Sequence, residues 1–420
     1  MGGIEMSDWK KVKLGELCDF INGGAWSDKE YISDGIPVLK VTNCKNSGFS
    51  ISELSYLPYS LKQKYSQNEL RLHDVIIATV GSHPNLVNSS AGRSVIVNSF
   101  VTGFYLNQNA VCIRTKKANI LNQLYFGYYS KYYLFQNYIQ MRGKGAANQM
   151  RIAISSIKDY PMPLPPIEHQ AYIAGILSRY DSLIENYQKQ IKLLEEAAQR
   201  LYKEWFVDLH FPGHKNTKIV DGVPKGWEKK KVREIGKVIT GKTPSTSKKE
   251  YYGGQIPFIT IPDMHTGIYP TSSQFLSDLG ANSQSGKFIP ANSLMVSCIG
   301  TAGLVCITKE ECQTNQQINS LVLNDNSLLY YMYNTFLTLK EHLNNIGSNG
   351  ATMTNVNKSK FESIEILIPN NSISNLYNKA VEQSFRGIKT LSSQICLLTE
   401  ARDRLLPKLM SGDIKIESLK

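Results

Sequence analysis

The chain has 420 residues, of which 42% are hydrophobic and 20% charged, as expected of a folded protein with more than one core. Its 47 Lys and Arg residues exceed its 35 Asp and Glu residues, and a net charge of +12 favours a polyanionic partner such as nucleic acid. Residues 1–13 have no apolar run typical of a signal peptide, and no stretch approaches the roughly 18 apolar residues of a membrane helix. The sequence therefore predicts a cytoplasmic protein without a membrane segment.

The seven cysteines are widely spaced, and none forms a C-x-x-C pair or lies beside a histidine at metal-ligand spacing. Pro212 and Gly213 separate His210 from His214, so these two histidines cannot share a helix face. The pattern favours reduced thiols that fill apolar gaps, and it predicts no metal site.

The chain contains an internal duplication. Residues 9–23 match 227–241 at a constant shift of 218, and 75–82 match 294–301. Later matches follow in the same order, with 107–109 answered by 315–317 and 190–201 answered by 394–405. The framework positions agree while the residues between them differ, which is typical of one binding module present twice with two ligands.

Each repeat begins with a strand-rich part, in which short β-branched runs are separated by Gly, Asn, Ser and Pro clusters. Prolines end each such part, and a long helical pattern follows. The sequence thus predicts an α+β protein with two tandem mixed α/β domains and two long helices that form an antiparallel coiled coil. The predicted boundaries are 1–160 for the first domain, 161–213 for the first helical segment, 214–365 for the second domain and 366–420 for the second helical segment.

The two helical segments carry apolar residues that step alternately by four and three positions, a heptad pattern that calls for a partner helix. Eight of ten positions are apolar in the second segment, where Ser384 and Arg402 are the exceptions. The alternative is that each helix packs only on its own domain. The predicted seam residues are Ile173, Leu177, Ile184, Ile191, Leu194, Leu201, Val381, Ile388, Leu391, Ile395, Leu398 and Leu405.

A helix over residues 173–205 would be about 48 Å long at 1.5 Å per residue. That length corresponds to on the order of fourteen base pairs of B-DNA. Two heads held apart by such a rod would act as a ruler, and we expect a split DNA target with an unread spacer of fixed length.

Motifs for catalysis do not stand out. There is no phosphate-binding G-x-x-x-x-G-K-[ST] loop, no dinucleotide fingerprint and no Asn/Asp-Pro-Pro-aromatic motif of amino-methyltransferases. Glu228-x-Lys230 resembles half of a nuclease motif, but Asp221 lies in a Gly/Pro turn without a preceding proline. We therefore predict no catalytic residue and a chain that lends DNA specificity to a partner enzyme. The alternatives are a stand-alone bipartite DNA-binding protein and a self-contained methyltransferase or nuclease.

Polar loops after Gly23 and Gly241, the turns near 81 and 300, and the segments 143–151 and 348–358 are the candidate contacts. Their hydroxyl, lysine and aromatic side chains suit phosphates and groove edges, whereas Arg or Lys suits guanine and Asn or Gln suits adenine. For any single residue, the alternative is a solvated surface loop. The candidate DNA-binding residues are Trp26, Ser27, Lys29, Lys40, Thr42, Ser82, His83, Lys144, Asn148, Gln149, Arg151, Lys242, Thr243, Ser245, Lys248, Lys249, Tyr251, Thr301, Thr354, Asn355 and Lys358.

Residues 145–149, the proline-rich run 161–170 and the heptad helix after it resemble the end of a target-recognition domain entering a spacer helix. Together with the duplication and the ending 404–412, they make the whole chain similar to specificity subunits of type I restriction–modification systems. The second repeat departs from the pattern at 368–371, where the Pro-Pro and the acidic-x-Gln are missing.

The resemblance implies two target-recognition domains, each reading one half of an asymmetric bipartite site in double-stranded DNA. It also implies that the paired helices bind two methyltransferase subunits, which use S-adenosylmethionine, and that restriction subunits using ATP and Mg join them. The chain itself would hold no cofactor and catalyse no reaction.

Overall fold

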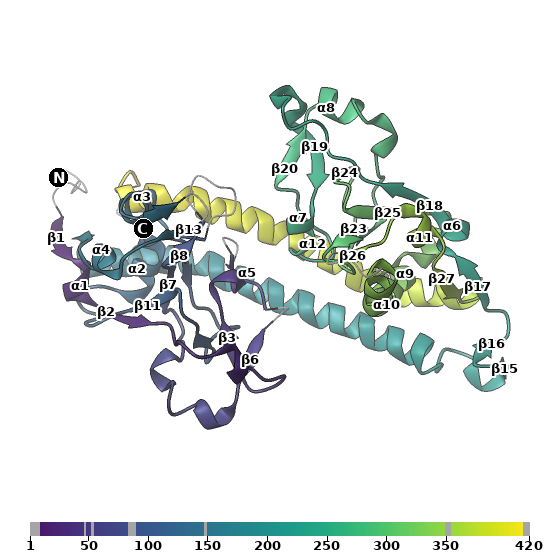
Figure 1. The fold of residues 1–420 in the computed structure, drawn as a ribbon, viewed down its shortest axis with the longest axis horizontal. Helices are drawn as coiled ribbons and strands as arrows, with labels where there is room; N and C mark the ends of the chain where they lie inside the picture. Colours follow the sequence, from purple (N-terminus) through teal and green to yellow (C-terminus); the bar gives the residue numbers. More distant parts are fainter. Residues whose placement is uncertain are drawn as a thin grey trace. The chain divides into compact units, whose positions relative to one another are not determined.

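The computed structural model describes residues 9–45, 48–51, 54–82, 90–146, 149–348 and 354–414. The chain divides into unit 1, which contains Met1–Leu183 and Leu398–Lys420, and unit 2, which contains Ile184–Leu397. These units cut across the predicted segments because each one includes a part of both long helices (Figure 1). No helix in the described ranges is both long and apolar enough to cross a membrane.

Among its described residues, unit 1 contains fourteen strands, four short α-helices and parts of two long ones. The strands are β1 (Lys10–Lys13), β2 (Cys18–Asn22), β3 (Ile36–Leu39), β4 (Cys44–Lys45), β5 (Gly48–Phe49), β6 (Ser55–Leu57), β7 (Val75–Ala78), β8 (Val80–Gly81), β9 (Ser94–Ile96), β10 (Tyr105–Leu106), β11 (Ala110–Thr115), β12 (Lys144–Ala146), β13 (Gln149–Arg151) and β14 (Pro161–Leu164). The short helices are α1 (Leu14–Leu17), α2 (Gln123–Tyr129), α3 (Tyr133–Gln140) and α4 (Ile154–Lys158), and α5 (Ile167–Tyr202) begins here.

Unit 2 repeats most of these elements. Its strands are β15 (Ile219–Val220), β16 (Val223–Pro224), β17 (Glu228–Lys231), β18 (Gly236–Thr240), β19 (Tyr252–Ile259), β20 (Gln274–Leu276), β21 (Leu294–Ser297), β22 (Ile299–Gly300), β23 (Val305–Ile307), β24 (Gln313–Thr314), β25 (Ile318–Leu323), β26 (Thr354–Asn355) and β27 (Glu365–Ile368). Its helices are α6 (Val232–Ile235), α7 (Ile261–Met264), α8 (Asp278–Asn282), α9 (Leu329–Thr338), α10 (Lys340–Gly347), α11 (Lys358–Glu362) and α12 (Asn371–Ser411).

The two units share one sheet order, so the predicted duplication and the α+β class are confirmed. The central sheet is β2-β11-β7-β9 in unit 1 and β18-β25-β21-β23 in unit 2, and a second sheet is β10-β3-β6 or β24-β19-β20. The central strands β7 and β21 are buried at every position, because the side chains on the two faces of each strand belong to two different apolar clusters. A strand that is buried on both faces can be apolar at every position, so the sequence of these strands is a continuous apolar run and not an alternation of apolar and polar residues.

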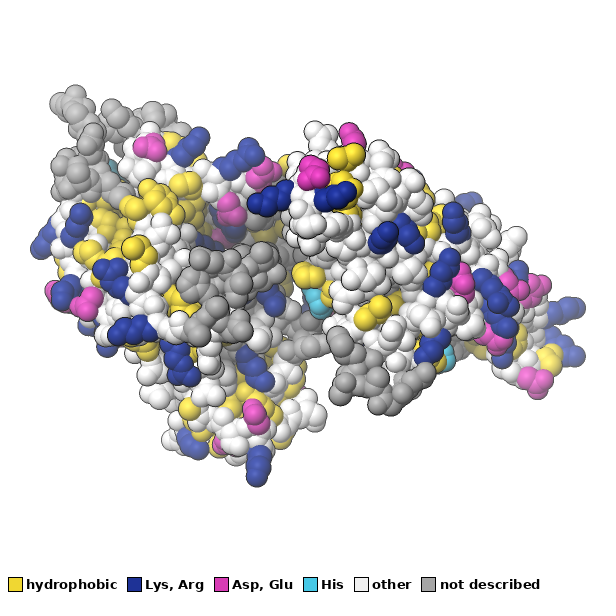
Figure 2. All heavy atoms as spheres, turned by 45° about the horizontal axis from the view of Figure 1, so that its top comes forward, with side chains coloured by type: hydrophobic (Ala, Val, Ile, Leu, Met, Phe, Trp, Pro, Cys, Tyr) yellow, Lys and Arg dark blue, Asp and Glu magenta, His cyan; other side chains and the backbone are white. Residues whose placement is uncertain are grey.

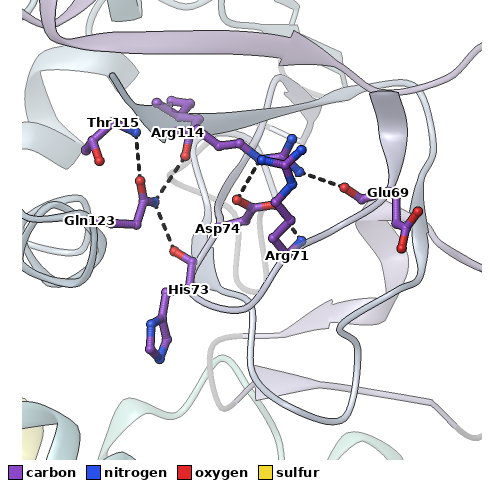
Figure 3. Close-up of polar contacts among 8 residues, drawn as sticks. Glu69, Arg71, His73, Asp74, Arg114, Thr115 and Gln123 are labelled. Atoms are coloured by element: carbon purple, nitrogen blue, oxygen red, sulfur yellow. Dashed lines mark hydrogen bonds and ion pairs between the residues drawn. The ribbon is translucent and has the colours of Figure 1, made fainter. Parts of the chain in front are cut away.

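A buried ion pair fixes the sheet of unit 1 (Figure 3). Arg114 on β11 donates from Nε and Nη2 to the Asp74 carboxylate, at 2.8 and 2.6 Å, and also to the Glu69 carbonyl oxygen. Asp74 is 3% exposed and Arg114 is 15% exposed, so this bidentate pair is shielded from water. Unit 2 has Ser293 and Val322 at the matching positions, which shows that the same frame is held there without the charges.

The predicted seam residues lie along faces of α5 and α12 that are wholly or partly buried. Ile173, Leu177, Ile184, Val381 and Ile388 are buried, and the other seven are partly buried. Each helix contacts both its own globular part and the other helix. Packing of helix on helix and packing of each helix on its own domain, the two interpretations of the sequence, therefore both occur. Within unit 1 the start of α5 packs against the end of α12, and within unit 2 the end of α5 packs against the start of α12.

Strict heptad spacing was wrong at several positions. Phe385 is buried instead of Ser384, Tyr202 is more buried than Leu201, and Leu406 is more buried than Leu405. The helices follow their natural period of 3.6 residues, so the buried row drifts by one position from a 3.5-residue repeat.

Two glycines hold the same loop contact in both units. A Cβ atom on Gly23 would lie 1.9 Å from the Asn107 carbonyl oxygen, and one on Gly241 would lie 2.1 Å from that of Asn315. We expect Gly23→Ala or Gly241→Ala to lower the free energy of unfolding by about 1–3 kcal/mol through overpacking. Thermal unfolding of the full chain measures this. The control is Gly175→Ala on α5, where no atom lies within 4 Å and alanine should stabilise the helix by about 0.5–1 kcal/mol. Equal effects at all three sites would contradict the role given to the loop contact.

Candidate nucleic-acid interface

In unit 2, hydrogen bonds join the loop after β18 to the loop before β25. Thr243 Oγ1 donates to Gln316 Oε1 at 2.6 Å, and Gln317 Nε2 donates to the Ile299 carbonyl oxygen at 3.3 Å. These two contacts connect three segments that are far apart in the sequence, and they place the polar loop after β18 beside the start of β22.

Strand pairing extends this edge. In β22 and β26, Ile299 pairs with Asn355 and Gly300 pairs with Thr354, and Thr301 follows with an exposed side chain. The structure thus brings together candidates that the sequence placed in separate segments. We call this edge the second contact row, made of residues 242–252, 299–301, 315–317 and 354–355.

Unit 1 contains the matching arrangement. Gln108 N donates to the Gly24 carbonyl oxygen at 3.0 Å, and Thr79 N donates to that of Asn109 at 2.8 Å. Strand β8 pairs with β13, which in turn pairs with β12. The first contact row therefore consists of residues 24–31, 79–82, 107–109, 144–146 and 149–151.

Both rows carry exposed positive charge. Lys144 and Arg151 face each other across β12 and β13, and both are exposed. In the second row Lys242, Lys248 and Lys249 are exposed. Figure 2 shows Lys and Arg side chains spread widely over the face drawn, so the net charge is not gathered into one patch there. Cations held at loop edges suit contacts to backbone phosphates.

Trp26 was predicted to contact DNA, and the structure corrects this. Its side chain is 7% exposed, its ring packs edge-on against Tyr65 at 5.2 Å, and Nε1 donates to Tyr31 Oη at 2.9 Å. The glycine-bounded loop was predicted to contact phosphates and groove edges, but its indole instead fills the core beneath the loop.

Some other candidates stabilise their own loops. Ser27 accepts a hydrogen bond from Lys29 N and caps the turn at 28–30. Lys40 Nζ donates to Ser55 Oγ at 2.9 Å and lies 4.3 Å from the centre of the Tyr31 ring. A lysine held in this way has less freedom to meet a phosphate than Lys242 or Lys249 of the second row, whereas Lys248 is held similarly by Tyr251, whose Oη accepts from its Nζ at 3.0 Å.

The remaining candidates stay predictions. His83 and Asn148 lie outside the described residues. Exposed side chains belong to Lys29, Thr42, Gln149, Ser245 and Lys358, whereas Ser82, Tyr251 and Thr354 are partly buried. Lys358 begins α11 and pairs with Glu362 at 3.5 Å.

Sequence reasoning did not identify the loops 107–109 and 315–317 as part of the site, although it noted that they match. Gln316 and Gln317 make the contacts that join the second row, and Gln108 does so by its main chain in the first. Their repetition as Asn-Gln-Asn and Asn-Gln-Gln after equivalent buried strands was the available signal.

Burial raises the pKa of Cys18, Cys44, Cys298 and Cys312 to about 12, so these thiols remain protonated at neutral pH. Among the residues that the structure describes, no group of three His, Cys, Asp or Glu side chains is placed to hold a metal ion.

Residues 6–196 and 224–396 match the family model of the type I restriction modification DNA specificity domain. The specificity subunit of the type I restriction enzyme HindI of Haemophilus influenzae is 30% identical, over 97% of this chain and all of that one. The MjaIX specificity subunit of Methanocaldococcus jannaschii is also 30% identical, over 63% of each chain. The crystal structure of a type I restriction–modification S subunit from M. genitalium has a TM-score of 0.55 and 15% identity, and the match covers 96% of both chains. That likeness shows the shared fold.

Trp26 is buried and Arg151 is exposed, so substitutions at these two positions of the first row should affect stability and DNA binding in opposite ways. Trp26→Ala should lower the free energy of unfolding by about 3–5 kcal/mol, because it removes a buried ring. Arg151→Ala should change stability by less than about 0.5 kcal/mol yet weaken binding to DNA. Thermal unfolding and a DNA titration at fixed salt check the pair. Lys117→Ala is the matched control, because Lys117 is exposed near the opposite end of β11. Weakening by Lys117→Ala equal to that by Arg151→Ala would contradict the placement of the row.

Proposed function

Because the chain belongs to the type I restriction–modification DNA specificity family, we propose that each contact row reads one half of an asymmetric, bipartite target in double-stranded DNA. The chain is a specificity subunit, and proteins of this kind bind DNA and assemble with other subunits. The observation that carries the proposal is the presence of two equivalent rows on one shared frame with different side chains.

The difference between the rows lies in their loops. The first row projects the β12–β13 hairpin with Gln149 and Arg151, whereas the second has the longer Lys- and Ser-rich loop after β18. Side chains such as Arg151 and Asn355 can make paired hydrogen bonds to guanine or adenine edges, and the lysines supply phosphate contacts. Unequal rows predict two unequal half-sites.

The long helices support a fixed spacer between the half-sites. α5 spans 36 residues and α12 spans 41. A helix of 36 residues is about 54 Å long. In this proposal the helices act as the ruler that sets the unread spacer.

We also propose that two methyltransferase subunits bind, one to each helix. Residues 190–201 and 394–405 agree at eight of twelve positions, and the agreement includes five exposed pairs. Those pairs are Gln190 and Gln394, Leu193 and Leu397, Glu196 and Glu400, Ala197 and Ala401, and Arg200 and Arg404.

Exposed side chains are not part of a packed core, so packing does not require them to be identical in the two repeats. Leu193 and Leu397 are each 65% exposed, and a large apolar side chain that is exposed at the same place in both repeats suits a contact with a partner. Neighbouring exposed positions have diverged, as Lys192 and Cys396 show. One partner surface used twice accounts for both observations.

The cofactors follow from these partners. S-adenosylmethionine would be held by the methyltransferase subunits, and ATP with Mg by restriction subunits that join them. The chain itself would catalyse no reaction and would work in the cytoplasm, where the DNA is. A stand-alone DNA-binding protein is the second candidate, and it would need no partner for the repeated exposed leucines.

The repeated leucines give a stoichiometric prediction. Leu193→Glu or Leu397→Glu should each leave one methyltransferase subunit bound, and the double variant none, because a charge cannot be buried in the apolar contact. Native mass spectrometry of the complex measures the subunit count. Gln199→Glu and Cys396→Glu are matched controls, since each adds one charge at an exposed position that differs between the repeats. Loss of both subunits from a single leucine variant would argue against two equivalent docking faces.

The proposal as a whole is tested by co-expressing the chain with the methyltransferase of its own system and mapping modified bases across the genome. We expect adenine methylation at a split motif with a constant spacer, absent when either protein is omitted. Arg151→Ala should relax one half of the motif and Asn355→Ala the other, each by a factor of roughly 10–100. Relaxation of both halves by one substitution would overturn the assignment of one row to one half-site, and a stable complex without methylation would overturn the proposed function.

A further inference from the structure

A polar cluster joins the two helices to the first globular part. Tyr128 on α2 donates from Oη to Asp181 Oδ2 on α5 at 2.6 Å, and Arg402 on α12 donates from Nη1 to Asp181 Oδ1. The Arg402 side chain is 11% exposed and Tyr128 is fully buried. Arg402 also donates to Asp403, whose side chain is 59% exposed. All of these residues belong to unit 1.

At the two positions equivalent to Asp181 and Arg402, unit 2 has uncharged side chains. The shift of 204 that aligns the helices places Phe385 where unit 1 has Asp181, and Ala198 where unit 1 has Arg402. Tyr333 on α9 takes the place of Tyr128, and its ring meets Phe385 edge-on at 5.5 Å. Ala198 is 2% exposed. The Asp181–Arg402 ion pair therefore has no counterpart in unit 2, where the carboxyl group near Tyr333 is that of Glu195, although the rest of the frame repeats.

This difference matters because duplicated helices have a second way to pair. The repeated seam residues let α5 of one copy meet α5 of a second copy, and α12 meet α12. In an α5–α5 pair, Asp181 would face Ala198 of the second copy, so its partly buried carboxylate, 33% exposed, would lose the Arg402 guanidinium and keep only the more distant charge of Lys131. In an α12–α12 pair, Arg402 would face Phe385. Removing one partner of a buried ion pair is strongly destabilising.

We propose that the Asp181–Arg402 pair selects the pairing of α5 with α12 over the pairing of like helices from two copies of this chain. The ion pair is not required for net stability, because unit 2 has a well-packed junction without such a pair. Its effect is to make both like-helix pairings worse. The partner surface concerned is the seam itself, and the rejected partner is a second copy of the chain.

A single cysteine reports the rejected pairing. Leu194 packs against Gly387, 3.3 Å from a Cβ atom built there, and the position equivalent to Gly387 in α5 is 183. In an α5–α5 pair residue 194 would thus meet residue 183 of the other copy, and Gln188, midway between them, would lie beside its own counterpart. Gln188→Cys in a Cys396→Ser background should form a disulfide-linked dimer only when like helices pair.

The experiment refolds the full chain and quantifies this linked dimer. Asp181→Phe with Arg402→Ala makes both junctions apolar, and Ala198→Arg with Phe385→Asp makes both charged. Each design removes the difference between the junctions, so each should raise the linked dimer at least roughly tenfold over the parent. Because the designs are chemically opposite, the second decides the matter if the first does not fold, as judged by circular dichroism.

Glu400→Ala with Arg404→Ala is the matched control. It removes an exposed ion pair on the same helix, and its two residues are repeated as Glu196 and Arg200, so it carries no information about pairing. We expect no increase in the linked dimer. A folded symmetric design that refolds with no more linked dimer than the parent overturns the proposal, and so does an increase in the control that equals the increase in the designs.

Discussion

The structure depends on one constraint, which is that neither long helix has its apolar face covered by a single neighbour. Ile173 and Leu177 join the core of unit 1 together with Leu406 and Leu409 from the other end of the chain. Tyr377 and Tyr202 do the same in unit 2, where their rings lie 6.4 Å apart. Burial of these side chains from water supplies the main favourable free energy. The globular part of unit 1 is therefore completed by residues that follow the whole of unit 2 in the sequence, whereas that of unit 2 is completed by the end of the helix that precedes it.

This arrangement lets the two ends of the helices differ. The charged junction of unit 1 and the aromatic junction of unit 2 solve the same packing problem with different chemistry. Elsewhere in the units the same substitution of chemistry recurs, since the Arg114–Asp74 pair of one sheet has only Val322 and Ser293 as its counterparts. The shared frame thus rests on backbone pairing and apolar burial, and the polar groups are free to specialise.

The fold was largely predictable from the sequence, because duplication and periodicity are properties of the backbone pattern. The repeated runs at 75–82 and 294–301 became equivalent strands and turns, and the helical pattern became α5 and α12. The exact seam was less predictable, since Phe385 rather than Ser384 is buried once the helix follows its own period.

The candidate site was predictable only as segments. Residue type alone could not show that Trp26 turns into the core or that Thr243 bonds to Gln316, because both depend on contacts between loops distant in sequence. The exposed residues of the hairpin and of the loop after β18 were identified more readily, since Gly and polar residues mark such loops directly.

The backbone contacts that hold the first contact row affect how its sequence can change during evolution. In the first row, main-chain hydrogen bonds from Gln108 and Thr79 and the pairing of β13 with β8 and β12 hold the backbone, so the exposed side chains of β13 contribute little to its shape. Substitutions at Gln149 or Arg151 can accumulate without unfolding the domain. A change in the recognised DNA sequence would then cost little stability of the fold. Related proteins could acquire new DNA targets while keeping a functional scaffold.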